Sequence, residues 1–250
     1  MTSKRPYTLA LRLFHVVLLA AILSATTASG SSFQKQLEKA GINYLVPSDG
    51  KAILVNIPAF ELIAFEDGTP VLRSRVIVGA PWHRTPRLTT YVSAVRFRPT
   101  WRPTPSMIAS GEHRDRVWPP GERNPLGLAA VRLQPGLLVY LHDTNRRELF
   151  VEENRALSHG CVRVERWMDL VSFVLDMDTA EVRNLAYGRR TFDAPAAPIP
   201  VELGYYTRFI DALGETVTYP DVYNLGQVSE LREEHPTEQA ELCAATAPVD

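Results

Sequence analysis

A cysteine and two histidines stand close enough along the chain to carry covalent chemistry. Ser158-His159-Gly160-Cys161 places a thiol beside an imidazole, and 15 residues separate a further histidine, His142, from Ser158. A thiol attacks a carbonyl only as the thiolate, so it needs a base or a positive charge nearby. Sequence spacing alone assigns no role to His159, whereas His142 can fold back across the site from the end of an expected strand. We interpret Cys161 as a nucleophile and His142 as its base.

The residues around the cysteine could complete a site for acyl transfer. Gly160 permits a tight turn, and the backbone N–H groups around Gly160 and Cys161 could then point at a developing oxyanion. Arg163 would share a side with Cys161 in a locally extended chain and could bind a substrate carboxylate. Pairing of Arg163 with Glu165 is the alternative.

Other polar and aromatic residues near this segment have two interpretations each. His159 is as compatible with packing or hydrogen bonding as with chemistry. Asp143 could orient a histidine, although its side chain is typical of a turn. Trp101 stands between prolines and is either a wall of the substrate cleft or an ordinary core aromatic. Neither His83 nor His113, both in Pro-rich loops, shows a pattern that assigns a function.

The chain contains two cysteines, Cys161 and Cys243, which an exported protein could pair. Cys243 lies in an acidic tail without apolar periodicity, and we expect this tail to be disordered. Cys161 is therefore expected to be a free thiol, for which reactivity is the usual reason.

The start of the chain is typical of a secretory signal. Lys4, Arg5 and Arg12 precede an uncharged run from Leu13 to Leu23, and small residues follow it. The run is shorter than the roughly 20 residues needed to cross a bilayer. We expect export to the periplasm or cell envelope, with an uncleaved anchor as the alternative. Lys and Arg number 27 against 28 Asp and Glu, and the signal takes basic residues with it, so nucleic acid is an unexpected partner.

The elements that must position the candidate residues are mostly strands. Apolar runs with many β-branched residues, separated by turn residues, predict an antiparallel meander over 52–78. Pro-rich loops separate three further short strands, the last of which delivers His142 at its end. These strands are expected over 91–97, 127–131 and 137–141.

Helical periodicity is limited to short segments. We expect helices at 33–40, at 167–175 and at 180–187, the last with Thr179 as its N-cap. Two strands, 199–210 and 215–219, are expected to close the domain as a hairpin. The fold class is therefore mainly β (α+β) with two or three helices.

The histidine and the cysteine segment together resemble the signature of the YkuD-type L,D-transpeptidases, which pairs an upstream His with S/T-H-G-C. The resemblance extends over roughly residues 51–225, and the final hairpin is similar to that of the YcbB-like branch. It implies a β-sandwich or barrel. The further segments that carry it are Ile53–Phe60, Val76–Gly79, Thr85-Pro86, Arg98–Pro103 and His142–Thr144.

The resemblance also implies roles for individual residues. Cys161 would be the nucleophile and His142 the general base, with the backbone carbonyl of Asp143 orienting the imidazole and Gly160 forming the turn. Four more residues would shape the substrate contacts, namely Ser158, His159, Arg163 and Trp101.

The implied reaction attacks the third-residue carbonyl of a peptidoglycan tetrapeptide stem, releases D-Ala and passes the acyl group to an acceptor amine. Formation of 3→3 crosslinks is favoured; exchange of the terminal D-amino acid and attachment of a protein to the wall remain open. The resemblance implies acylation by carbapenems, and we expect a monomer without a metal or other cofactor.

The expected organisation is a signal peptide over 1–28, a short segment over 29–50, the catalytic domain over 51–225 and the acidic tail over 226–250. The YcbB-like branch usually carries a peptidoglycan-binding module and a long capping insertion. We expect neither here, and a short Pro-rich loop over 104–125 takes the place of the insertion.

Two other functions compete with this interpretation. A zinc hydrolase could use His142, His159 and Cys161 as ligands, although their spacing matches no known ligand pair. A wall-binding protein could keep the fold without the chemistry, but it would have no need for the intact His and Cys.

Overall fold

The meander predicted over 52–78 is present in the computed structural model, which describes residues 32–226. Its strands β1 (Lys51–Asn56), β2 (Glu61–Glu66) and β3 (Thr69–Gly79) pair antiparallel in chain order. Asp67 and Gly68, with φ of 47° and 73°, form the tight turn between β2 and β3. Two central residues with positive φ match the twist of a two-residue hairpin, which explains why this turn closes so tightly.

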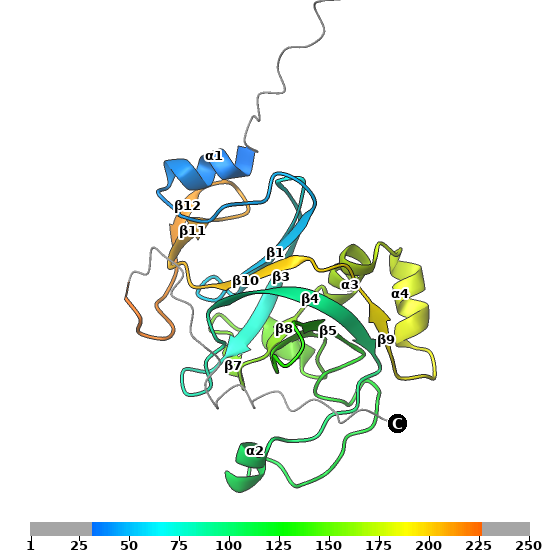
Figure 1. Ribbon diagram of the computed structural model, residues 1–250. Helices are drawn as coiled ribbons and strands as arrows, with labels where there is room; N and C mark the ends of the chain where they lie inside the picture. Colours follow the sequence, from blue (N-terminus) through cyan, green and yellow to red (C-terminus); the bar gives the residue numbers. More distant parts are fainter. Residues whose placement is uncertain (1–31, 227–250) are drawn as a thin grey trace, which may run out of the picture. The chain divides into compact units, whose positions relative to one another are not determined.

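The meander is one wall of a closed barrel (Figure 1). β10 (Pro200–Gly204) closes the ring because it pairs parallel with β1 and antiparallel with β4 (Leu88–Phe97). From β4 the ring continues through β5, β6 and β8 back to β3. The remaining bounds are β5 (Ala129–Leu133), β6 (Tyr140–His142), β7 (Ala156–Ser158), β8 (Val162–Val164) and β9 (Phe192–Pro195).

The C-terminal hairpin is shorter than predicted. The expected strand over 199–210 divides into β10, which belongs to the barrel, and β11 (Arg208–Ile210), which alone pairs with β12 (Thr216–Thr218). The side chain of Asn56 divides it, donating to the carbonyl of Tyr206 at 3.1 Å and accepting from its N–H at 3.0 Å. These bonds take up main-chain groups that a continuous strand would use in pairing.

The helices lie around the barrel, and there is one more than expected. They are α1 (Ser32–Lys39), α2 (Pro105–Ala109), α3 (Trp167–Leu175) and α4 (Thr179–Ala186), with a 3-10 turn, η1 (Arg147–Val151). The extra helix, α2, forms inside the Pro-rich loop because Thr104 caps its N-terminus and Pro105 suits its first turn. The N-cap of α4 is Asp178 rather than the predicted Thr179. Asp178 is extended and forms a capping box with Glu181.

Two apolar clusters bury both faces of the first two strands. Ile53 and Leu62 point into the barrel. Their neighbours Leu54 and Ile63 point outwards and pack against the segment that begins with α1. Burial on both faces explains why these strands are continuously apolar instead of alternating.

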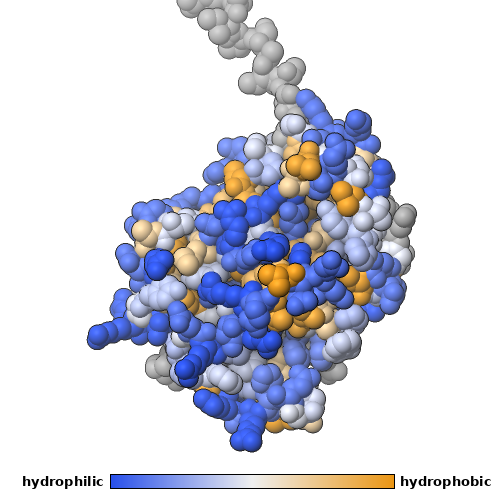
Figure 2. All heavy atoms as spheres, turned by 180° about the vertical axis from the view of Figure 1, so that it is seen from behind, coloured by the Kyte–Doolittle hydropathy of each residue, from blue (hydrophilic) through white to orange (hydrophobic). Residues whose placement is uncertain are grey.

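The outer surface is largely hydrophilic on the face opposite to that of Figure 1, where hydrophobic residues form only small groups (Figure 2). Within residues 32–226, none of the helices combines the length and the apolar character needed to cross a bilayer. The predicted signal peptide and acidic tail lie outside the described residues, as does Cys243.

Candidate active site

Pairing of β6 with β8 brings the predicted catalytic residues together. The two strands are parallel, with Leu141 opposite Val162 and His142 opposite Arg163. Leu141 and Val162 point into the barrel core. Because side chains alternate along a strand, His142 and Arg163 share the outer face, and Cys161, one residue before β8, lies on that same face. The register of one strand pair thus sets the position of the base, the cysteine and the arginine.

Cys161 is buried beside β6, with an exposed fraction of 4%. Its Sγ accepts a hydrogen bond from the N–H of Tyr140 at 3.3 Å and lies 3.8 Å from the carbonyl oxygen of Leu138. The expectation of a free thiol is wrong, because Cys161 is disulfide-bonded. Composition predicts the local order of a tail, but disulfide formation depends on how closely two Cα atoms approach in the fold.

The turn that carries Cys161 is held by hydroxyl groups. Gly160 has a φ of 108°, which residues with a side chain rarely adopt. The hydroxyl of Ser158 donates to the carbonyl of Cys161 at 2.5 Å and accepts from the N–H of Gly160 at 3.1 Å. The N–H of Gly160 is therefore already engaged inside the turn, and both hydrogen bonds of the Ser158 side chain are local. The predicted contacts of Gly160 with an oxyanion and of Ser158 with substrate stay predictions.

A second hydroxyl, that of Thr85, anchors the turn to the barrel. Thr85 is fully buried; its Oγ1 donates to the carbonyl of Gly160 at 2.8 Å and accepts from the N–H of Gly79 at 2.9 Å. The hydroxyl of Tyr223 extends this network, accepting from the N–H of Thr85 at 3.1 Å and donating to the carbonyl of Gly79 at 2.7 Å. Sequence reasoning gave neither residue a role; the only signal was that Thr85-Pro86 belongs to the resembling segments.

His142 is oriented by the backbone as expected. Its Nδ1 is hydrogen-bonded to the carbonyl of Asp143, which favours the tautomer with a proton on Nδ1 and a lone pair on Nε2. Burial, and next the positive charge of Arg163, lower the pKa of His142 from 6.5 to about 3, against the opposing effect of the carbonyls of Asp143 and Leu126. The lowered pKa keeps the imidazole neutral at pH 7, so that one ring nitrogen can accept a proton, but it also makes His142 a weaker base than an exposed histidine.

The side chain of Asp143 points away from this chemistry. Its Oδ2 accepts from the N–H of Leu128 at 2.9 Å, and Arg147 donates to its Oδ1 at 2.9 Å. A Cβ on Gly127 would lie 2.3 Å from that Oδ2, so the glycine admits the carboxylate. Burial raises the pKa of Asp143, and Arg147 opposes the rise. The side chain therefore fixes a turn, as the second interpretation had it, while its backbone carbonyl reaches the imidazole.

Arg163 is a partly buried guanidinium that faces the site. Burial is the main reason that its pKa falls to about 10, and repulsion from Arg146 adds to the fall. At neutral pH it stays charged. The alternative partner, Glu165, instead pairs with Arg75 at 2.5 and 2.8 Å. Within residues 32–226, no carboxylate lies within 4.0 Å of the Arg163 side chain.

One pocket of about 240 Å³ is lined by His142, Ser158, His159, Cys161 and Arg163, and the Pro-rich loop forms its other side. Trp101 is buried there, and its ring meets that of His113 edge-on with centroids 5.1 Å apart. Trp101 also lines the pocket, so it serves as both a core aromatic of the loop and a wall. The members of the lining that sequence reasoning did not select are Met107, His113, Trp118, Pro125, Leu126, Asn145, Arg146 and Leu157.

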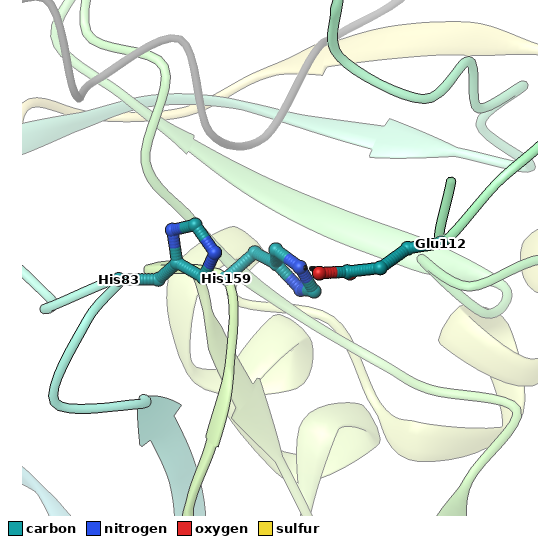
Figure 3. A group of neighbouring side chains, drawn as sticks. All are labelled: His83, Glu112 and His159. Carbon is teal, nitrogen blue, oxygen red and sulfur yellow. Dashed lines mark hydrogen bonds and ion pairs between the residues drawn. The ribbon is translucent and has the colours of Figure 1, made fainter. Parts of the chain in front are cut away.

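His159 also lines the pocket, and its side chain contacts Glu112 and His83. Its Nε2 is 2.6 Å from Oε2 of Glu112, and its ring stacks on that of His83 with centroids 4.6 Å apart (Figure 3). Burial lowers the pKa of His159, while Glu112 opposes the effect. Sequence reasoning selected neither Glu112 nor His83, because each lies on a separate loop and only the fold brings them to His159.

The ligand set of the zinc-hydrolase alternative is not the cluster that forms. Among the described residues, the group whose ligand atoms approach one another is His83, Glu112 and His159, and it does not contain His142. Of the expected ligands, only His159 takes part.

Comparison with known proteins identifies the same part of the chain. The L,D-transpeptidase catalytic domain of the YkuD family matches residues 50–182. A putative L,D-transpeptidase of Haemophilus influenzae is 32% identical over 232 residues, covering 76% of this chain and 47% of that protein. The probable L,D-transpeptidase YbiS of Escherichia coli K12 is 33% identical over 120 residues, covering 46% and 38%.

Among solved structures, an L,D-transpeptidase from Mycobacterium smegmatis aligns with a TM-score of 0.41 at 18% identity, covering 62% of this chain and 58% of that one. The chain spans about half the length, or less, of the curated relatives it matches.

Proposed function

The chain belongs to the YkuD family of L,D-transpeptidase catalytic domains, and we propose that it is a cysteine acyltransferase acting on peptidoglycan stem peptides. One observation carries the proposal: the β6–β8 register puts His142, Arg163 and the Cys161 turn on the same face, where all three line one pocket. This combination of a cysteine, an oriented base and a cation meets the needs of thioester chemistry.

The first half of the reaction forms the acyl-enzyme. The Nε2 lone pair of His142 accepts the proton of the Cys161 thiol, and the sulfur attacks the third-residue carbonyl of a tetrapeptide stem. The new C–S bond gives a tetrahedral intermediate. When the C–N bond breaks, the departing amine of D-Ala takes the proton from His142, and a thioester remains on Cys161.

The second half transfers the acyl group. The amine of an acceptor attacks the thioester carbonyl, gives its proton to His142, and forms an amide as the C–S bond breaks. The thiolate then recovers the proton from the imidazole. With a diaminopimelate side chain as acceptor the product is a 3→3 crosslink, and the chain's resemblance to the family favours this product over D-amino acid exchange or protein attachment.

Arg163 would hold the donor in place. It is charged, partly buried and lies beside His142, and no carboxylate among residues 32–226 lies within 4.0 Å of it. A stem peptide offers carboxylates that a guanidinium binds through two parallel hydrogen bonds. Trp101 and its neighbours on the loop would supply the apolar side of the same cleft.

The disulfide adds a condition to this function. A sulfur bonded to another sulfur cannot be acylated, so the disulfide-bonded protein is catalytically silent until a thiol reductant returns Cys161 to the thiol. A disulfide is common in exported proteins, which agrees with the signal-like start of the chain. We propose the periplasm or cell envelope as the location.

The decisive experiment incubates the reduced protein with purified disaccharide-tetrapeptides and identifies the products by mass spectrometry. The expected result is crosslinked dimers that have lost D-Ala, and none with Cys161→Ala. Equal dimer yields from the two proteins would refute the assignment.

A second experiment separates the enzyme from a wall-binding protein that only keeps the fold. The reduced protein is incubated with a carbapenem, and its intact mass is measured. One covalent adduct is expected on the reduced protein, and none on the oxidised protein or on Cys161→Ala. An unmodified reduced protein that still binds peptidoglycan would favour the non-catalytic alternative.

A further inference from the structure

Three loops that are distant in sequence bring two imidazoles and a carboxylate together beside the pocket. His83 lies between β3 and β4, Glu112 follows α2, and His159 stands between β7 and β8. One ligand atom from each lies within 4.8 Å of the other two. In Figure 3 Glu112 reaches the His159 ring from one side, while the His83 ring lies on the other. The catalytic steps proposed above use none of the three.

We propose that His83, Glu112 and His159 bind a divalent transition metal of the zinc class. Zn²⁺ accepts two imidazoles and one carboxylate as protein ligands and leaves a fourth position for water or another oxygen donor. Imidazole ligands favour zinc over magnesium or calcium, which prefer oxygen.

The distances fit after small side-chain rotations. Zn²⁺ holds nitrogen and oxygen ligands about 2.0–2.2 Å away, so neighbouring ligand atoms in a tetrahedral site stand about 3.4 Å apart. The Nε2 of His159 and Oε2 of Glu112 are closer than this, at 2.6 Å, and would separate to admit the ion. Glu112 and His159 are partly exposed, with side-chain exposures of 42% and 24%, so both can rotate and a hydrated ion can reach them.

The position of the cluster suggests what the metal does. Most hydrogen bonds of the loop over 98–128 stay within it, including the four of Asn124. At its ends the loop is bonded to Asp143, Ala186 and Thr191. Nearer its middle, His159 bonds to Glu112, and Asn145 bonds to the carbonyl of Arg123 at 3.1 Å. A metal would replace the bond between His159 and Glu112 by three bonds to one ion and would fasten the loop to both His83 and the cysteine turn.

The test measures Zn²⁺ binding by calorimetry to the untagged, oxidised full chain, after thiol titration has verified that no free sulfhydryl competes. We expect one saturable site. His83→Gln, Glu112→Gln and His159→Gln should each weaken it by at least about tenfold. Because the oxidised protein is catalytically silent, this result stands or falls independently of the proposed acyl transfer.

Two control variants identify the ligand set. His113→Gln removes a neighbouring imidazole of the same loop, and Glu122→Gln removes an exposed carboxylate; both should leave zinc affinity within about twofold. Thermal unfolding without metal verifies that each variant is folded, and Glu112→Gln, at an exposed position, remains informative if a histidine variant is not.

A spectroscopic measurement reads the same site directly. Co²⁺ in place of Zn²⁺ should give the visible absorption of four-coordinate cobalt in the parent but not in Glu112→Gln. Absence of saturable binding, binding unaffected by the three ligand substitutions, or an equal loss in His113→Gln would each overturn the proposal.

Discussion

The two sides of the pocket are built by different means. On the barrel side, His142, Cys161 and Arg163 are placed by main-chain pairing of β6 with β8 and by apolar residues beneath them. On the loop side, Trp101 and Trp118 are placed by side-chain hydrogen bonds and a single bridge between the two tryptophans. The groups of the proposed chemistry therefore stand on main-chain pairing within the barrel, whereas the wall proposed to contact substrate stands on a loop held mainly by its own side chains.

The barrel side is tested most severely by removing its reactive groups. Cys161→Ala should abolish turnover, and His142→Gln should lower kcat/KM by about 10²- to 10⁴-fold. Steady-state assays on muropeptides check both. The matched control is Cys243→Ala, which removes the chain's other cysteine and keeps the nucleophile; it should be active without reductant. A Cys243→Ala protein that is active only after reduction would contradict the assignment of the disulfide as the block.

The next largest effect is expected from removing the Thr85 hydroxyl that anchors the cysteine turn. Thr85→Val removes the Oγ1 that bonds the carbonyl of Gly160 and the N–H of Gly79, leaving two buried groups unpaired. It should lower the free energy of unfolding by about 2–4 kcal/mol. Urea unfolding measures this.

Thr90→Val is the matched control, because the buried hydroxyl of Thr90 has no hydrogen-bond partner among the described residues. Its stability should be unchanged or higher. If Thr85→Val and Thr90→Val have the same free energy of unfolding, the hydroxyl of Thr85 does not anchor the turn.

Acid should unfold the barrel side through His142. In the unfolded chain this imidazole binds a proton near pH 6.5, whereas burial lowers its pKa to about 3 in the folded protein. The unfolded state therefore binds more protons as the pH falls below 6.5, and the free energy of unfolding falls by up to about 1.4 kcal/mol per pH unit. Between pH 6.5 and pH 5 the parent should lose about 2 kcal/mol more than His142→Gln in urea unfolding. If the stability of the parent and that of His142→Gln change equally with pH, the folded and unfolded states bind protons equally at His142, which would contradict the lowered pKa.

The loop side should respond differently. Asn124→Ala removes a side chain that bonds four main-chain groups of the loop, yet the loop can open without the barrel. We expect faster proteolytic cleavage within 98–128 and a higher KM, with a loss of less than about 1 kcal/mol in global stability. Asn184→Ala, on exposed α4, is the control. A large global loss would mean that loop and barrel unfold as one unit.

The smallest effect is expected from breaking the ion pair between Arg75 and Glu165. Glu165→Gln breaks the exposed pair with Arg75 and should change the free energy of unfolding by less than about 1 kcal/mol. Turnover should stay within about twofold of the parent. A strong loss of turnover would revive the alternative in which Glu165 serves Arg163.

Local patterns predicted most of the barrel and selected Cys161 and His142, which line one pocket. Apolar runs, the Asp67-Gly68 turn and helical spacing after Cys161 each act within a few residues, so the meander, α1, α3 and α4 were predictable. The division of the last strand was not, because it depends on Asn56 meeting Tyr206 across the fold. The cap of α4 was misplaced by one residue, since Asp178 and Thr179 both suit a cap and geometry chooses between them.

The site shows the same limit. A motif selects Cys161 and His142 as candidates, but only contact across loops reveals Thr85 and Tyr223 behind the turn, or His83 and Glu112 beside His159. The disulfide of Cys161 escaped prediction for the same reason, because the sequence around one cysteine does not show which groups approach it in the fold.

The segment that begins with α1 bears on how the domain can be cut. Phe33 and Leu37 cover outward-facing side chains of β1 and β2, among them Phe65. A recombinant fragment that starts at residue 50, where the family match starts, would lack α1 and expose this apolar surface on an otherwise complete barrel. Such a fragment should aggregate in solution although it contains every residue of the proposed chemistry. Recombinant fragments should therefore start no later than Ser32.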